Sequence, residues 1–305
     1  MKILIFSDSH IRASTPRCRK DNFPTALWEK FRQITQIILD RGINAVLMGG
    51  DLFDTPNPSI SIVNSYLQLF TYWKIPIYSI VGSHDKFGYN NDTLYRTGLG
   101  TLIASGAVQL LNETQRIGNN TQIAGVSHSY DLDEHPETDY YRKKLNPDEY
   151  LIEVCHGMLL DVPWKFSKHT NVKEIRTEAD LCVGGHYHPG FSAIQVENTT
   201  VVNVGSLGRV ENIHRKFPPG VIVVDTDIVG KEFWEFIPLN VSEDVFRTKE
   251  IKVEKAYENI NTFIQLLKDR SNNFECGNIK ELIVTVGKKE KYSKEIIEKA
   301  LKYIE

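Results

Sequence analysis

The sequence of 305 residues contains no long apolar run, only 4 cysteines and no excess of basic charge. No apolar stretch approaches the roughly 20 residues needed to cross a bilayer. The segment from Met1 to Asp8 is too short and too soon acidic for a signal peptide. We therefore expect a cytoplasmic protein without a membrane segment. The formal net charge of -3 argues against a generally basic protein that coats nucleic acid, although it permits a local basic rim.

The cysteines argue against disulfides and zinc knuckles. Cys18, Cys155, Cys182 and Cys276 occur without CxxC spacing, and two of them fall inside predicted strands, so we expect reduced thiols. The chain has no internal repeat or low-complexity tract. With 41% hydrophobic and 25% charged residues, it has the composition of a globular chain, long enough for one large domain and one small domain.

Five apolar runs end in an aspartate, a histidine or a small polar residue. These runs and the residues that follow them are 3–6 with Asp8 and His10, the run ending at Met48 with Asp51, 75–81 with Ser83, His84 and Asp85, 151–155 with His156, and 181–183 with His186 and His188. A single aspartate after a strand is most often a helix cap or a turn residue. In open α/β sheets, however, ligands bind beyond the carboxyl ends of the strands. The recurrence therefore favours one shared metal site centred on Asp51, whose two carboxylate oxygens are able to bridge two cations.

The chain first alternates strands with helices and then becomes rich in strands. Apolar residues at helical spacing predict helices over 25–41 and 59–73, and Gly42 ends the first of them. From Val108 onward, short alternating runs predict a sheet with less helix between its strands. Together these elements predict a sandwich of two sheets flanked by helices.

The character of the sequence changes near residues 238–243. Beyond this point, runs at 249–253 and 282–286 predict strands, and the segments 257–269 and 293–304 predict helices. We therefore expect a catalytic domain over 1–240 and a small α+β cap over 241–305.

The candidate ligands indicate which metals fit. Histidines outnumber carboxylates, and imidazole suits zinc, iron or manganese, whereas a calcium or magnesium site would be nearly all oxygen. The motifs DxH, GDxxD, GSHD, HG and GHxH, in that order, resemble those of the calcineurin-like metallophosphoesterases. Within that family the chain is most similar to the SbcD-type DNA-repair nucleases and their phage relatives, through GDLFD, the basic loop after DxH and the C-terminal cap.

The resemblance implies a fold, two cofactors and a set of site residues. The fold is a four-layer α/β/β/α sandwich of two mixed sheets, and the cofactors are two divalent ions, with manganese expected and iron, zinc or magnesium as alternatives. One ion would be bound by Asp8, His10, Asp51 and His188, and the other by Asp51, Ser83, His156 and His186. His84 would act on the leaving oxygen without binding metal, while Asp85 and Asp54 would orient it and the ligands.

Ser83 departs from the family pattern, which has asparagine at that position. The asparagine oxygen lies one bond further from the backbone, so we expect the serine oxygen to fall short of the second ion, which then binds weakly or is completed by water. The resemblance also implies an SbcC-like coiled-coil ATPase as a partner and admits a homodimer. Only about 65 residues follow the expected catalytic domain, however, which leaves little room for the helices that bind such an ATPase.

Substrate contacts are less sharply indicated than metal ligands. Basic and aromatic residues in loops near the catalytic edge predict a rim for a phosphate backbone, although solvation alone explains any one of them. The candidates are Arg12, Arg17, Arg19, Lys20, Tyr187 and Arg209. Solvation or local bonding is also the favoured interpretation of His128, although His128 is able to reach the rim of the site.

The favoured function is a manganese-dependent DNA nuclease, either an exonuclease or a structure-specific endonuclease, with DNA as its partner. Two alternatives stay open. One is a phosphatase or cyclic-nucleotide phosphodiesterase that acts on small molecules. The other is a weakly active DNA-binding subunit with an impaired second metal site.

Overall fold

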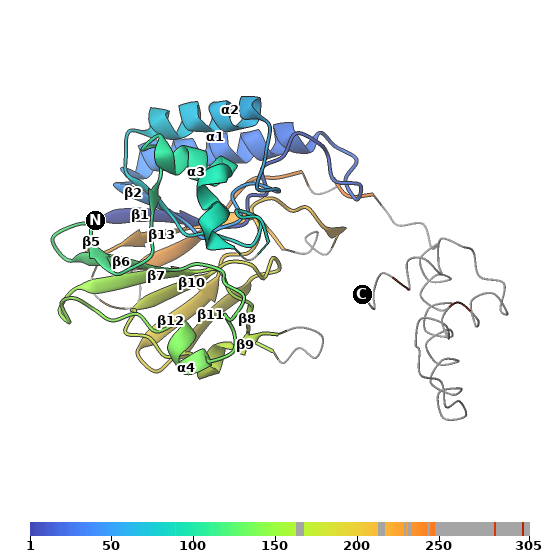
Figure 1. Cartoon of the computed structure of the whole chain (residues 1–305). Coiled ribbons are helices and arrows are strands. Elements are labelled where there is room, and N and C mark those ends of the chain that lie inside the picture. The colour runs from blue at the N-terminus through green and yellow to red at the C-terminus, as the bar shows by residue number, and fades with distance from the viewer. Residues whose placement is uncertain are drawn as a thin grey trace. The chain divides into compact units, whose positions relative to one another are not determined.

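The computed structural model of the chain describes residues 1–88, 90–162, 168–212, 217–228, 230, 233–242, 245–247, 284 and 301 (Figure 1). The chain divides into two units, Met1–Arg247 and Thr248–Glu305. The cap expected over 241–305 lies almost entirely outside the described residues. The expected boundary after residue 240 therefore stays a prediction.

The first sheet is built from strands of both ends of the first unit. Its strand order is β14-β13-β1-β2-β3-β4, in which β1 to β4 run parallel and β13 pairs antiparallel with both β1 and β14. The strands are β1 (Lys2–Phe6), β2 (Ala45–Met48), β3 (Ile77–Ser79), β4 (Gln109–Leu110), β13 (Gly220–Asp225) and β14 (Trp234–Pro238).

The second sheet is contributed by the middle of the chain. Its order is β11-β12-β10-β7-β6-β5, with a parallel centre of β12, β10, β7 and β6 and an antiparallel strand at each edge. The strands are β5 (Gln115–Arg116), β6 (Thr121–Val126), β7 (Tyr150–Cys155), β10 (Leu181–Gly184), β11 (Phe191–Val196) and β12 (Thr199–Asn203).

Three helices, α1 (Phe23–Arg41), α2 (Ile60–Trp73) and α3 (Gly98–Ala104), lie over the outer face of the first sheet (Figure 1). The side chain of Asn22 caps α1 by accepting a hydrogen bond from the backbone N of Thr25 at 3.1 Å. Gly42 ends the helix in the left-handed conformation, with φ of 63°. The two helices predicted from apolar spacing are thus confirmed, with α1 beginning slightly earlier than expected.

Shorter elements complete the described part of the fold. They are the 3-10 helix η1 (Asn91–Arg96), the helix α4 (Pro136–Asp139), the 3-10 helix η2 (Val172–Glu174) and a two-stranded sheet of β8 (Leu159–Leu160) and β9 (Thr170–Asn171). Residues near α4, β8 and η2 pack on the outer face of the second sheet in a small apolar cluster. The outermost layer on this side is therefore thin.

Side chains point alternately to the two faces of each sheet, and this alternation creates the layers. In β1, Leu4 and Phe6 pack in the cluster that contains Phe31 of α1, whereas Ile3 and Ile5 pack in the cluster that contains strands of the second sheet. Because each face of the first sheet is apolar, it is buried between helices and the second sheet. The predicted sandwich of two mixed sheets is confirmed.

Among the described residues, no helix is long and apolar enough to span a membrane. Cys18, Cys155 and Cys182 are free thiols, as expected, and Cys276 lies outside the described residues.

Candidate metal centre

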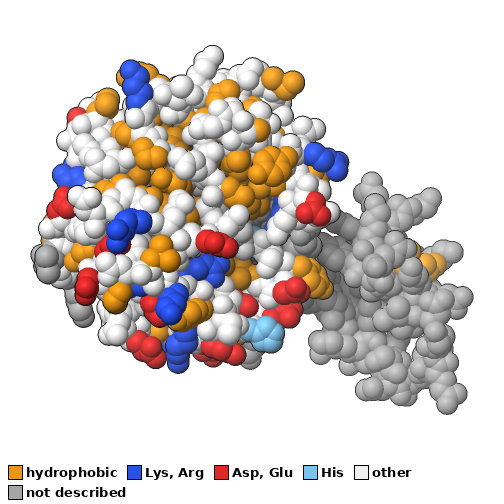
Figure 2. Space-filling view, turned by 60° about the vertical axis from the view of Figure 1, so that its left-hand side comes forward, with side chains coloured by type: hydrophobic (Ala, Val, Ile, Leu, Met, Phe, Trp, Pro, Cys, Tyr) orange, Lys and Arg blue, Asp and Glu red, His pale blue; other side chains and the backbone are white. Residues whose placement is uncertain are grey.

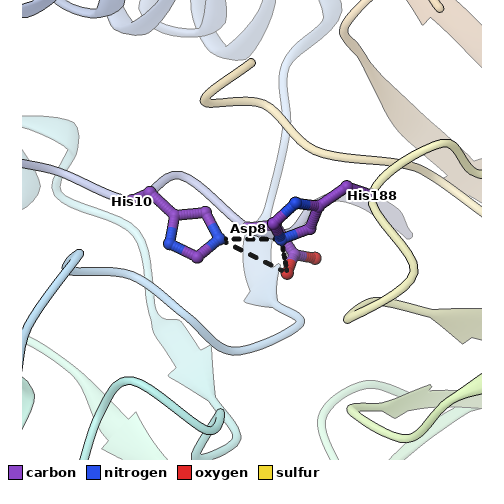
Figure 3. Close-up of side chains that lie close together, drawn as sticks. All are labelled: Asp8, His10 and His188. Atoms are coloured by element: carbon purple, nitrogen blue, oxygen red, sulfur yellow. Dashed lines mark hydrogen bonds and ion pairs between the residues drawn. The ribbon is translucent and has the colours of Figure 1, made fainter. Parts of the chain in front are cut away.

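A first group of ligand atoms lies where β1 and β10 end (Figure 3). Nε2 of His10 lies 2.9 Å from Nε2 of His188, and the same nitrogen of His188 lies 3.4 Å from Oδ1 of Asp8. Asp8 and His10 are buried, while His188 is partly exposed. Two imidazole nitrogens and a carboxylate thus converge on one point, which is open to solvent on one side.

A second group adjoins the first through Asp51, which follows β2. Oδ2 of Asp51 lies 3.2 Å from Nε2 of His156 and 4.0 Å from Nε2 of His10. Asp51, His156 and His186 each offer an atom within 4.8 Å of the other two. One buried carboxylate therefore faces both groups of imidazoles.

Strained loops hold these residues in place. Asp8, His10, Asp51 and His186 adopt left-handed backbone conformations with φ of 53°, 46°, 50° and 65°. Such conformations are uncommon for residues other than glycine and cluster at functional sites. A Cβ at Gly82 would overlap the carboxylate of Asp51, so this close approach requires glycine.

Buried hydrogen bonds fix the carboxylates. Asp85 accepts backbone N–H bonds from Asp51 at 2.8 Å, from Leu52 at 3.2 Å and from Gly82 at 2.9 Å, so it ties the β2 loop to the β3 loop. Asp8 accepts a bond from the backbone N of His186 at 3.0 Å, which ties β1 to β10. The two sheets are therefore joined at the site itself.

The protonation of the histidines follows from burial and from Asp51. Burial lowers the pKa of His10 and of His186 to about 4, so both imidazoles are neutral at pH 7. Burial also disfavours the charged form of His156, but the neighbouring Asp51 carboxylate outweighs it and raises the pKa of His156 to about 10. A cation bound by His156 would therefore replace a proton, so its binding is coupled to proton release.

The donors fit a divalent ion of the first transition row. Ligand atoms about 2.1 Å from one ion stand roughly 3.0 to 4.2 Å apart, from neighbouring to opposite positions, and the separations of 2.9, 3.2, 3.4, 3.9 and 4.0 Å at this site agree with that range. Nε2 of His156 is buried and, within the part of the chain that the structure describes, has no hydrogen-bond partner of good geometry. Mixed imidazole and carboxylate donors suit manganese, iron or zinc.

The profile of the calcineurin-like phosphoesterase family matches residues 1–190, the part of the chain that contains both groups. The chain belongs to this family. The resemblance seen in the motifs is thereby confirmed. Calcineurin-like phosphoesterases bind divalent metals, which agrees with the donors found here.

Several calcineurin-like relatives are DNA-repair proteins. The chain is 28% identical over 165 residues to the DNA double-strand break repair protein Mre11 of Methanosarcina acetivorans, covering 52% of this chain and 25% of that protein. It is 20% identical over 284 residues to the Mre11 protein of Sulfolobus acidocaldarius, covering 90% and 72%. A dimetal phosphatase from Danio rerio has the same fold, with a TM-score of 0.50 at 9% identity over 73% of this chain and 91% of that one. The chain thus spans from a quarter to about three quarters of the length of these two repair proteins.

His84 lies beside the first group at the exposed edge of the phosphoesterase site. Its ring centroid is 4.8 Å from that of His10, its backbone N donates to Oδ1 of Asp51 at 2.7 Å, and its Nδ1 donates to the carbonyl O of Asp54 at 2.8 Å. The Asp54 carboxylate instead pairs with Arg12 at 2.9 Å and lies 3.8 Å from Nδ1 of His10. Asp54 thus orients His84 through its backbone carbonyl, while its carboxylate pairs with Arg12.

Ser83, where the family has asparagine, turns its hydroxyl toward Asp51. Its Oγ donates to Oδ2 of Asp51 at 3.0 Å and lies 3.4 Å from Oδ1. Oδ2 of Asp51 is also the carboxylate oxygen that lies 3.2 Å from Nε2 of His156. Ser83 therefore lies in the second group, and its role as a metal ligand stays a prediction.

The predicted substrate residues divide into exposed and buried ones. Arg12, Arg17 and Lys20, in the loop after β1, are partly or largely exposed, and Tyr187 is partly exposed between two histidines of the site. On the face shown in Figure 2, basic and acidic side chains are interspersed, as the small net charge suggests. Of the predicted basic contacts, those that are exposed or partly exposed lie in the loop after β1.

Arg19 and Arg209 are buried instead. They are 2% and 4% exposed, and their guanidinium groups lie 5.4 and 5.1 Å from the ring centroid of Phe246. Arg19 also pairs with Asp21 at 2.7 Å and donates to the carbonyl O of Arg209 at 3.1 Å. These contacts hold two loops together, so we propose no substrate contact for either arginine.

His128 lies beside the second group, although solvation or local bonding was the favoured interpretation of this histidine from the sequence. Its ring lies 5.5 Å from that of His186 and 6.2 Å from that of His156, measured between centroids. The sequence carries a signal for His128, because the apolar residues 123–126 are followed by Ser127 and His128, just as the other five runs are followed by polar residues.

A first prediction concerns the carboxylate of Asp51. Asp51→Asn removes a charge that faces both groups, so both bound ions should be lost or weakened at least about a hundredfold. Manganese titration by calorimetry measures this, with Asp40→Asn, an exposed carboxylate on α1, as a control that binds like the wild type. One ion retained at its original affinity would assign Asp51 to a single ion.

A second prediction concerns Ser83. Because the hydroxyl is short and engaged with Asp51, the wild type should bind its two ions with unequal affinity, and Ser83→Asn should narrow the difference by about tenfold. The same titration measures both constants. Equal, tight affinities in the wild type, or weaker binding after Ser83→Asn, would show that serine is a competent ligand.

Proposed function

We propose that the chain is a metal-dependent nuclease that hydrolyses phosphodiester bonds of DNA, with two divalent ions, manganese first among them, at the centre around Asp51. The observation that carries this proposal is the single buried carboxylate of Asp51, which lies 3.2 Å from His156 and 4.0 Å from His10. Both distances are measured from the same oxygen, Oδ2, which therefore lies between the two groups of imidazoles. Asp8, His10, Asp51 and His188 would hold one ion, and Asp51, Ser83, His156 and His186 the other.

The chemistry at this centre would come from both the ions and the chain. When bound, two divalent ions supply Lewis acidity, which polarises a phosphoryl group and makes water more acidic. The partly exposed His188 and the exposed His84 mark the side from which a phosphodiester enters. The buried His10 and His156 keep the opposite side closed to water.

His84 is the residue placed to act on the leaving oxygen. Its Nδ1 carries a proton, because the Asp54 carbonyl that it contacts at 2.8 Å is only an acceptor. Nε2 is therefore the nitrogen left to contact a substrate oxygen, and the backbone bond from His84 to Asp51 fixes the ring beside the carboxylate. With a second proton on Nε2, as imidazolium, His84 would stabilise negative charge on the phosphoryl group or protonate the departing oxygen.

DNA is the proposed substrate for two reasons. The relatives named above are DNA double-strand break repair proteins. In addition, Arg12, Arg17 and Lys20 lie in the loop after β1, the strand whose end carries Asp8 and His10, and this basic loop would contact the phosphate backbone. Arg12 pairs with Asp54 at 2.9 Å, and Arg17 and Lys20 are the other two proposed phosphate contacts of this loop. An ATPase partner and a homodimer stay predictions.

A third prediction tests the substrate. The chain with manganese should degrade labelled single- or double-stranded DNA, and Arg17→Ala combined with Lys20→Ala should raise the KM for DNA by about tenfold while the rate on bis-p-nitrophenyl phosphate changes little. End-labelled and circular substrates separate exonuclease from endonuclease products. Hydrolysis of p-nitrophenyl phosphate or a cyclic nucleotide without DNA cleavage would favour the small-molecule alternative. Salt-dependent DNA binding without hydrolysis of any ester would favour the binding subunit.

A fourth prediction tests His84. Because its ring lies beside the metal groups and is held by Asp54, His84→Ala should lower kcat by roughly a hundredfold while the manganese content stays near that of the wild type. Metal analysis after gel filtration and steady-state kinetics provide the two readouts. Loss of an ion together with activity would make His84 a ligand, as its proximity to His10 and Asp51 also permits.

A further inference from the structure

A cavity of about 300 Å³ adjoins the second group of the metal centre. His186, a member of that group, lines the cavity, which therefore begins next to the place where the second ion and the scissile phosphate are proposed to bind. Tyr130 and Leu132, in the loop after β6, and Met158, directly before β8, also line it. Ligand sites in proteins have volumes from about 300 Å³ upward, so the cavity is large enough for a nucleobase.

Hydrogen bonds fix the walls of this cavity. Oδ2 of Asp133 accepts a bond from the backbone N of Met158 at 2.9 Å. Nζ of Lys168 donates to the carbonyl O of Tyr130 at 2.9 Å and to Oε1 of Glu134 at 2.8 Å. These bonds join the loop after β6 to the residues that precede β8 and β9, so the walls are preorganised for a ligand.

The lining offers an exposed aromatic ring and apolar surface. Tyr130 is 68% exposed, and Nζ of Lys168 lies 5.9 Å from its ring centroid. Leu132 is buried and Met158 is partly exposed. Nucleobases stack on exposed aromatic rings, and the flexible thioether of methionine adapts to flat ring systems. The cavity is therefore suited to a flat, mainly apolar group.

The charges of the lining indicate which part of a nucleotide fits. Among the Asp, Glu, Lys and Arg side chains described in the lining, there are two carboxylates, those of Asp133 and Glu134, and one cation, that of Lys168, which pairs with Glu134. A phosphate group would meet a net negative charge there and is disfavoured. A neutral base meets no such repulsion, so the base rather than the phosphate fits the cavity.

We propose that this cavity binds the base of the nucleotide next to the scissile phosphate, with the ring of Tyr130 as the surface on which the base stacks. The inference rests on the proposed function and deepens it, because it adds a base subsite to the metal centre. Tyr130 would thus determine specificity for nucleotides over phosphoesters that have no base.

Inhibition of DNA cleavage by nucleotides with and without a base tests the proposal. The full chain with manganese is assayed on labelled DNA in the presence of deoxyadenosine 3′- or 5′-monophosphate, or of the matching deoxyribose phosphate. For the wild type, one of the two nucleotides should inhibit at least about tenfold more strongly than its counterpart without a base. Tyr130→Ala should remove this advantage without changing inhibition by deoxyribose phosphate, and Tyr130→Phe should keep it. The control is Tyr72→Ala, an exposed tyrosine on α2, which should match the wild type.

Other outcomes overturn the proposal in distinguishable ways. Equal inhibition with and without the base in the wild type would exclude a base subsite, while leaving the proposed nuclease intact. Weaker inhibition of Tyr130→Ala by the nucleotide and the deoxyribose phosphate alike would assign Tyr130 to the shape of the loop and would exclude stacking. Loss of the advantage in Tyr130→Phe would likewise exclude stacking. A wild type that cleaves no DNA would overturn the proposed function and, with it, this inference.

Discussion

The burial of one carboxylate, that of Asp51, is the constraint on which the site depends. Asp51 is 1% exposed, and a buried charge is costly unless it is paired and hydrogen-bonded. Its oxygens accept bonds from the backbone of His84 and the hydroxyl of Ser83, and His156 lies 3.2 Å away. The Asp51 backbone is held in turn by Asp85. Every one of these partners comes from a loop other than that of Asp51, so the loops assemble together or not at all.

The two sheets meet in this assembly. The first sheet delivers Asp8, Asp51 and His84, and the second delivers His156 and the histidines after β10. Between the sheets lies a continuous apolar cluster that includes Ile5 of β1 and Val154 of β7. Burial of this cluster holds the strand ends together, and the polar loops then take up strained conformations that an isolated sheet would not support. The core thus provides the rigidity that the centre requires.

Much of this arrangement could be predicted from the sequence, because strand ends carry a local signal. An apolar run that is followed by Asp8, Asp51 or His156 predicts both the strand and the polar residue at its end. The structure brings those residues together. Helices α1 and α2 were equally predictable from apolar spacing. The strand β11 was not, because its residues are mainly exposed or partly exposed and give no apolar run.

Other features depend on contacts between segments that are distant in the sequence, so no local sequence pattern predicts them. The guanidinium groups of Arg19 and Arg209 are buried against Phe246, which is far from both in the sequence, so their charge alone suggested a surface role. Asp54 contacts His84 through its backbone carbonyl, and its carboxylate pairs with Arg12 instead, an arrangement that depends on how the loop folds. His128 had the same local signal as the other histidines, but its two-residue motif resembled no known pattern.

We propose that the carboxylate of Asp51 is shared by two ions. Electron paramagnetic resonance of the wild-type chain loaded with two equivalents of manganese tests this most directly, because two Mn²⁺ ions bridged by a carboxylate are magnetically coupled. We expect a broad spectrum with the closely spaced hyperfine lines of a coupled pair, which gives way to the signal of single ions in Asp51→Asn. A wild-type spectrum of isolated six-line Mn²⁺ at full loading would contradict a shared Asp51.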